Sequence, residues 1–320
     1  MPNLLPSPNK LITTITKMTK TNPSAPYQTG VSTRLAARSQ TLTTQTSGLA
    51  PSHLQANLLV LPARYAPSFR LLCRRNPVPC PLIAQSSHPG SFSQLTSYLR
   101  PTSPSNPAPI KLAWDIDLRR DAPKYIVYRD GEPVEEVHDL ESHWGPDHVG
   151  FLIGCSYSFE EALSNAGLPP RHTVQGRNVA MYRTTVPLLP AGVFTGGTYV
   201  VSMRPYRVED VERVREITRR YVATHGEPIA WGWEGMRRLG IEDIGKPDWG
   251  DVPLMGDGEG VFGEGKEDGV VPVFWGCGVT PQEAVMKAGL EGVVMGHAPG
   301  HMIVLDVKDH EVFGGAVKSR

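Results

Sequence analysis

The chain has 320 residues, 40% of them hydrophobic, which is enough apolar material for the core of one large domain or two ordinary ones. It contains no uncharged apolar run near the roughly 18 residues that a membrane span needs, and its first residues lack the apolar stretch of a signal peptide. The composition therefore predicts a soluble globular protein with no membrane partner.

The charge is unevenly distributed, although 32 Lys and Arg residues balance 32 Asp and Glu residues. No acidic residue precedes Asp115, whereas eleven Lys and Arg residues lie in residues 1–114. A basic, acid-free start rich in Ser and Thr is typical of a mitochondrial transit peptide, and equally of a disordered extension. A nucleic-acid-binding arm is disfavoured, because the basic residues are neither clustered nor interleaved with aromatic ones. We therefore expect residues 1–27 to be a disordered or targeting extension, and the protein to belong to the mitochondrial matrix or the cytoplasm.

The first half of the chain contains few clear secondary-structure signals. An apolar run over 54–62 predicts a buried strand, and the next segment, 64–76, predicts a short helix. Residues 86–109 are rich in Ser and Pro and are expected to form a loop. An Asp-Gly dipeptide between two alternating segments predicts a β-hairpin over 123–137.

Strands and helices alternate in the second half of the chain, which favours an α/β layered fold. The acidic, glycine-rich segment 256–269 has almost nothing to bury and is expected to be a mobile loop. The expected strands are 150–154, 178–186, 198–205, 227–232, 271–276 and 301–307, and the expected helices are 158–167, 208–226 and 280–289.

One unit of this second half occurs twice, over 151–168 and 273–290. In each copy an apolar strand runs into Gly-Cys, two more residues follow, and a helix begins. Ser158 and Thr280 are the expected N-caps, each with a Glu three positions later and a glycine that ends the helix. Loops that leave the carboxyl ends of strands bind ligands in α/β sheets, so we expect both cysteines at the same edge of one sheet.

The repeated cysteines, Cys155 and Cys277, are candidate catalytic groups. The four cysteines of the chain show no CxxC pair and no zinc-finger spacing, which predicts reduced thiols. A thiol just before a helix N-terminus is expected to have a lowered pKa, and the free amides there can hold a carboxylate. Two such turns facing each other would form an acid-binding cleft. The alternative is that Cys is simply a small residue tolerated in a tight turn.

The segment 296–306 contains two further candidates, His297 and His301. Their spacing of four would suit a zinc helix, but the Pro-Gly between them forbids one. General acid–base catalysis or substrate binding fits two histidines on such a loop better. A structural hydrogen-bonding role, with Asp306 as an orienting partner, is the alternative.

Polar side chains on or beside other apolar strands are candidates for binding substrate. Each also has a structural alternative, as a surface charge, an internal ion pair or a satisfied internal amide. No glycine-rich nucleotide motif is present, so we expect neither a cofactor nor a metal. The candidates are Gln55, Asn57, Arg177, Asn178, Arg183, Arg204 and Thr280.

Several long segments resemble the D-glutamate cyclase-like family, whose bacterial members bear the label "putative hydro-lyase". These segments include "APSHLQANLLVLP", "YRDGEPVEEV", "FLIGCSYSFEEAL", "GRNVAMYRT", "VPVFWGCGVTPQ" and "HAPGHM", and the match extends in order over about 31–307. The resemblance implies an α/β sandwich with a smaller inserted α+β domain. We place the main domain at 28–178 and 268–320, and the insert at 179–267.

For the animal member, the resemblance implies conversion of D-glutamate to 5-oxo-D-proline and water in mitochondria. The expected partner is therefore a small amino acid, and a homo-oligomer is compatible with the sequence. Under this hypothesis Arg177 binds the α-carboxylate, the amides beside Cys155 or Cys277 hold the reacting carboxyl group, and His297 or His301 transfers protons.

Two other functional hypotheses remain open at the sequence level. A pair of thiols on opposite faces of a Cα atom is how cofactor-free amino-acid racemases remove and return a proton. A non-catalytic protein that binds a small acid is the third hypothesis.

Overall fold

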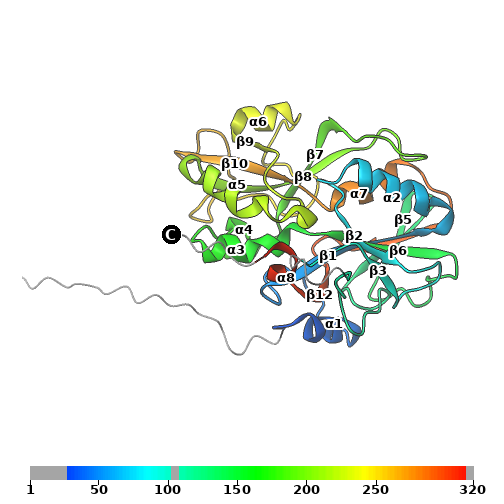
Figure 1. Ribbon diagram of the computed structural model, residues 1–320. Coiled ribbons are helices and arrows are strands. Elements are labelled where there is room, and N and C mark those ends of the chain that lie inside the picture. Colours follow the sequence, from blue (N-terminus) through cyan, green and yellow to red (C-terminus); the bar gives the residue numbers. More distant parts are fainter. Residues whose placement is uncertain (1–26, 102–107, 315–320) are drawn as a thin grey trace, which may run out of the picture.

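The computed structural model describes residues 27–101 and 108–314, so the predicted extension over residues 1–27 lies almost entirely outside the described residues. It has a mixed α/β fold, as predicted, with two separate antiparallel sheets. Figure 1 shows the smaller sheet with its helices at the top of the molecule and the larger sheet below it. No helix in the described ranges is long and apolar enough to cross a membrane.

The larger sheet is built around β1 (His53–Pro62), which is buried along nearly its whole length. On one side β1 pairs with β6 (His148–Gly154). On its other side β11 (Val293–His297) and β12 (Ile303–Lys308) pair with successive parts of the strand, so the loop between these two strands lies beside the middle of β1. The sheet order β3-β2-β6-β1-β11-β4-β5 is completed by β2 (Leu82–Ser86), β3 (Leu95–Ser97), β4 (Tyr125–Arg129) and β5 (Glu132–Val137).

The smaller sheet has the order β7-β8-β10-β9. It consists of β7 (Ala180–Pro187), β8 (Thr198–Arg207), β9 (Ala230–Trp231) and β10 (Val270–Gly276). β10 pairs with β8 along its whole length, so this sheet includes a strand that lies beyond the insert boundary expected at residue 267.

Helices cover the sheets and bury their apolar faces. α2 (Ala66–Arg75) and α7 (Val279–Lys287) contribute to the core on one face of the larger sheet, where Phe69 packs against Phe151. α1 (Gly30–Arg38) is held to β12 by the buried Arg34, whose Nη1 atom lies 2.9 Å from Asp306 Oδ1. The remaining helices are α3 (Glu160–Asn165), α4 (Arg171–Val174), α5 (Val211–Arg219), α6 (Gly232–Arg238) and α8 (Asp309–Phe313).

The hairpin and most of the expected strands are confirmed. Asp130 and Gly131 both have positive φ, as a tight hairpin turn requires. The helix expected over 208–226 was predicted too long: α5 covers only its centre, and His225 has a φ of 87°, which is incompatible with a helix. The Ser/Pro-rich segment 86–109 was expected to be a loop, but it includes β3.

The acidic segment 256–269 is mostly exposed, as expected, but its centre is buried. Phe262 is fully buried and stacks on Trp233, with ring centroids 5.3 Å apart. Glu267 forms an ion pair with Arg171, with an N–O distance of 2.8 Å. One aromatic residue among many polar ones is thus enough to fix this segment to the smaller sheet.

Candidate active site

The two Gly-Cys turns belong to different sheets. Cys155 follows β6 of the larger sheet, and Cys277 follows β10 of the smaller one, so the prediction of one common sheet edge is wrong. The two thiols nevertheless lie in one buried cluster, together with Tyr157, Val200 and Met302. The repeat therefore brings two turns together from two sheets.

The hydrogen bonds around the two cysteines are equivalent. The Cys155 N–H donates to Gln55 O of the neighbouring strand β1, and the Cys277 N–H donates to Val200 O of the neighbouring strand β8, both at 3.1 Å. Each thiol also accepts a backbone N–H two residues further along the chain. The same local sequence thus makes the same turn against two unrelated neighbouring strands.

The hydroxyl groups of Ser158 and Thr280 are part of this turn and do not cap a helix. Ser158 Oγ accepts the N–H of Gln55 at 3.1 Å, and Thr280 Oγ1 accepts the N–H of Val200 at 2.9 Å. The N-cap positions are taken by Phe159 and Gly278 instead. The predicted capping boxes are therefore wrong, and the Thr280 hydroxyl is bound to the main chain inside the protein.

The glycines at the helix ends were predicted correctly. Gly167 and Gly289 have φ values of 80° and 55°, in the left-handed region that favours glycine after a helix.

Burial raises the pKa of both thiols, whereas the sequence predicted lowered values. Cys155 and Cys277 are 7% and 8% exposed, and desolvation outweighs the backbone N–H groups that favour a thiolate. The pKa of Cys277 is raised to about 11, and that of Cys155 is raised further. Both buried cysteines are therefore neutral thiols near pH 7.

Asn57 joins both turns to His297. Its Nδ2 atom donates to Gly154 O at 3.1 Å, beside the first turn, and its Oδ1 atom lies 2.9 Å from His297 Nε2. At the second turn, a Cβ on Gly278 would overlap the Asn57 amide, so a residue without a side chain is required there. Asn57 thus connects β1, both Gly-Cys turns and β11.

His297 is almost fully buried between two oxygen atoms. Asn57 Oδ1 lies 2.9 Å from Nε2, and the Ala298 carbonyl oxygen lies 2.8 Å from Nδ1. Two acceptors favour the doubly protonated ring, but burial dominates and lowers the pKa of His297 to about 4. The imidazole is therefore neutral near pH 7, and an anion entering the cluster would favour its protonation.

The loop that carries His301 is held by the main chain. His301 Nδ1 lies 2.9 Å from Pro299 O, and Gly300 O accepts the N–H of Thr46 at 2.8 Å. Gln55 bonds to Thr46 through both ends of its amide, so Gln55 supports this loop from β1. Asp306 binds Arg34 and does not orient either histidine.

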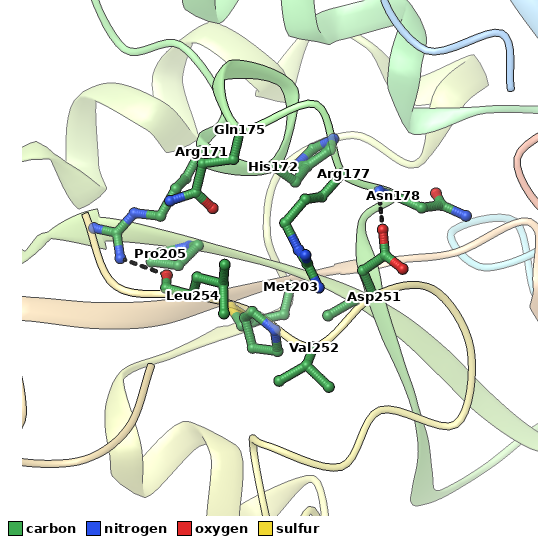
Figure 2. Close-up of a pocket in the computed structure, with 12 residues that line it drawn as sticks. Arg171, His172, Gln175, Arg177, Asn178, Met203, Pro205, Asp251, Val252 and Leu254 are labelled. Atoms are coloured by element: carbon green, nitrogen blue, oxygen red, sulfur yellow. Dashed lines mark hydrogen bonds between the residues drawn. The ribbon is translucent and has the colours of Figure 1, made fainter. Parts of the chain in front are cut away.

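Arg177 and Asn178 line a small pocket next to the thiol cluster. Figure 2 shows the Arg177 side chain extending into this pocket between His172 and Asp251. Arg177 forms no ion pair within the described part of the chain, and its buried Nε atom has no hydrogen-bond partner there. Asp251 accepts the N–H of Asn178 at 2.7 Å, which fixes the start of β7. The pocket therefore offers an unpaired cation to an acidic ligand.

Tyr157 contacts both the thiol cluster and residues of the pocket wall. It packs in the thiol cluster, and its hydroxyl group donates to Asn178 Oδ1 at 2.6 Å. Its ring also stacks on His172, with ring centroids 6.2 Å apart. Tyr157 therefore connects the thiol cluster to two residues of the pocket wall, Asn178 and His172.

The other two candidate arginines are engaged in ion pairs. Arg204 is fully buried, and its Nε atom lies 3.1 Å from Glu160 Oε1. Arg183 pairs with Asp248 and Glu283 at N–O distances of 2.6 and 2.8 Å. Both arginines therefore form the internal ion pairs that were the alternative to substrate binding.

The sequence predicted the cysteines, Asn57, His297 and Asn178 as site residues, and the structure places them close together. The sequence did not predict His172 and Glu160. Both lie within or just after the first copy of the repeat, and no spacing in the sequence marks them. Within residues 27–101 and 108–314, no three His, Cys, Asp or Glu side chains gather so that they could hold a metal ion.

The chain is similar to proteins of one family. Residues 149–306 match the family model described as D-glutamate cyclase. A protein of Schizosaccharomyces pombe named "Putative hydro-lyase" is 44% identical over 87% of this chain and 84% of its own length. Proteins of the same name in Bordetella pertussis and Rubrobacter xylanophilus are 44% and 46% identical, over 87% and 83% of this chain and 89% and 91% of their own lengths. Among solved structures, a nitrogen repressor-like protein of Methanococcus jannaschii matches with 12% identity over 84% of this chain and 96% of its own, at a TM-score of 0.28, too low to bear on function.

Proposed function

Because the chain belongs to the D-glutamate cyclase family, we propose that it is a hydro-lyase that converts D-glutamate to 5-oxo-D-proline and water. The observation that carries this proposal is the unpaired Arg177 in a pocket that adjoins a buried cluster of proton-carrying groups. Arginine binds carboxylates well in such partly buried sites. A dicarboxylic amino acid has one carboxylate for Arg177 and a second to react.

The chemistry consists of one bond formed and one broken. The amine nitrogen attacks the side-chain carboxyl carbon, and one oxygen of that carboxyl group leaves as water. The nitrogen gives up two protons in total, and the departing oxygen gains two, so the site needs groups that accept and donate protons.

We assign these roles to the residues already described. Arg177 and Asn178 bind the α-carboxylate, and the side-chain carboxyl reaches the turns of Cys155 and Cys277. The negative charge of the reacting carboxyl favours protonation of His297, which then donates a proton to the departing oxygen. Asn57 positions His297, Arg204 positions the turn of Cys155, and Gln55 positions the loop that carries His301.

The test is a chiral chromatographic assay of D-glutamate, L-glutamate and 5-oxoproline, with and without a chelator. We expect production of 5-oxo-D-proline from D-glutamate only. His297→Gln, which removes the proposed proton donor, should lower kcat by about 10² or more, whereas His88→Gln, a change at an exposed histidine, should not. No product from D-glutamate would refute the substrate assignment.

A two-cysteine racemase is the second candidate, since both thiols lie in one cluster. Its weakness is that burial raises the pKa of both thiols, while a racemase needs one thiolate. Incubation in deuterated water separates the two activities, because a racemase must introduce deuterium at Cα and a cyclase need not. Location in the mitochondrial matrix or the cytoplasm remains a prediction.

A further inference from the structure

His172 has the surroundings of an acid–base residue, although the roles above leave it out. Its side chain is 9% exposed and lines the Arg177 pocket. Its Nε2 atom lies 3.2 Å from Glu160 Oε1. Its Nδ1 atom is buried and has no hydrogen-bond partner among the described residues. Because buried polar atoms are normally hydrogen-bonded, an unpaired one at a pocket wall indicates a position where a ligand binds.

The Glu160 carboxylate fixes the orientation and tautomer of His172. Glu160 also accepts from the fully buried Arg204, whose Nε atom lies 3.1 Å from Glu160 Oε1, and this guanidinium keeps the carboxylate ionised. The carboxylate can therefore only accept, so the Nε2 atom of His172 carries the hydrogen. In the neutral ring this leaves Nδ1 as an acceptor. A carboxylate that orients a histidine in this way is a recurrent arrangement at catalytic sites.

The pocket therefore holds two complementary unsatisfied groups. Arg177 Nε is a donor without an acceptor, and His172 Nδ1 is an acceptor without a donor. The head group of an α-amino acid supplies both missing partners, since its carboxylate accepts and its ammonium group donates. A simple carboxylic acid would satisfy only Arg177.

We propose that this pocket binds an α-amino acid head group, with the carboxylate at Arg177 and the ammonium group at His172 Nδ1, and that His172 is the catalytic residue that removes the first ammonium proton. The proton-removal step rests on the proposed cyclase function, whereas recognition of the head group does not. When Nδ1 takes a proton, the amine lone pair becomes free to attack the side-chain carboxyl carbon. The second nitrogen proton leaves after attack, and both protons end on the departing water.

Binding is tested by the ¹⁵N signal of His172 Nδ1, recorded while D-norvaline or pentanoate is added to the wild-type protein. These two probes differ only in the ammonium group, and neither has a second carboxylate to cyclise. D-norvaline should shift the Nδ1 signal, and pentanoate should not. The signal is assigned by its loss in His172→Gln. An Nδ1 signal that D-norvaline does not shift overturns the proposal.

Catalysis is tested with His172→Ala and its control His88→Ala on D-glutamate. His172→Ala should lower kcat by about 10² to 10⁴ and also raise KM, because it removes both the proton acceptor and the partner of the ammonium group, and added imidazole should restore part of the rate. A purely structural role would give no rescue, and an unchanged kcat would refute proton removal by His172. If the wild-type protein does not convert D-glutamate, the cyclase function fails, while a D-norvaline-dependent shift still supports the head-group pocket.

Discussion

Glu160 is the residue whose loss should most destabilise this site. It is 5% exposed and is the only acidic partner of the fully buried Arg204 among the described residues. Glu160→Gln keeps the shape of the side chain but removes its charge, which leaves the Arg204 guanidinium without a counter-charge and with only neutral partners, the amide oxygen, Ser156 and Ser202. Breaking a buried ion pair by removing one partner typically costs about 3–5 kcal/mol. This is a large part of the roughly 5–15 kcal/mol that stabilises an ordinary domain.

Urea unfolding measures this cost. We expect Glu160→Gln to lower the free energy of unfolding by about 3–5 kcal/mol. Glu161→Gln is the matched control, because its half-buried carboxylate accepts only a hydrogen bond from Ser52, and it should cost about 1 kcal/mol. The double variant Glu160→Gln/Arg204→Met should be more stable than Glu160→Gln alone, since it removes the unpaired buried charge. A loss below about 1 kcal/mol for Glu160→Gln, or additive effects in the double variant, would refute the reasoning.

The pH dependence gives an independent check with a definite sign. The pKa of Glu160 is about 2 in the folded protein, below its ordinary value of 4.5, so the folded state binds the proton less readily than the unfolded state. The stabilisation is therefore fully present above pH 4.5 and is lost as the pH falls towards 2. The stability curve of Glu160→Gln should lack this component.

Three further predictions concern the two turns. Gly278→Ala should lower stability by about 1–3 kcal/mol in urea unfolding, because its Cβ would overlap the Asn57 amide; unchanged stability would contradict this packing. Tyr157→Phe removes the hydroxyl that binds Asn178 and should cost about 1 kcal/mol while raising KM for D-glutamate, so equal KM values would argue against the proposed binding of the α-carboxylate by Asn178. Cys155 and Cys277 should resist iodoacetamide at pH 7 in the native protein and react in urea, as mass spectrometry would show, because burial raises the pKa of both thiols.

Local signals in the sequence predicted the elements whose structure depends on local interactions. The Asp-Gly turn of the hairpin needs positive φ values that these residues tolerate, whatever surrounds them. The second half of β1, residues 58–62, contains no polar side chain, so only a position with both faces covered suits it. The glycines after α3 and α7 likewise follow from backbone sterics.

Tertiary contacts decided what the sequence could not predict. Ser158 and Thr280 stand at positions typical of N-caps, but each hydroxyl is bound to the main chain of a neighbouring strand. That strand is distant in the sequence, so the local pattern does not predict the hydrogen bond. The thiol pKa values depend on how much of each cysteine is buried between two sheets, and this desolvation outweighs the local N–H groups. His172 was missed for the same reason, since its partner Glu160 is itself held by Arg204 of the distant strand β8.

The residue directly after each cysteine explains how one repeated turn serves two different purposes. In the first copy this residue is Ser156, whose hydroxyl accepts from Arg204, and Arg204 in turn holds the Glu160 that orients His172. In the second copy it is Gly278, whose missing side chain makes room for Asn57 and, through it, for His297. The shared hydrogen bonds fix both turns in the same way, and the position after the cysteine is one at which the two copies differ. Under the proposed roles, the first copy then serves the amino-acid head group and the second serves the reacting carboxyl.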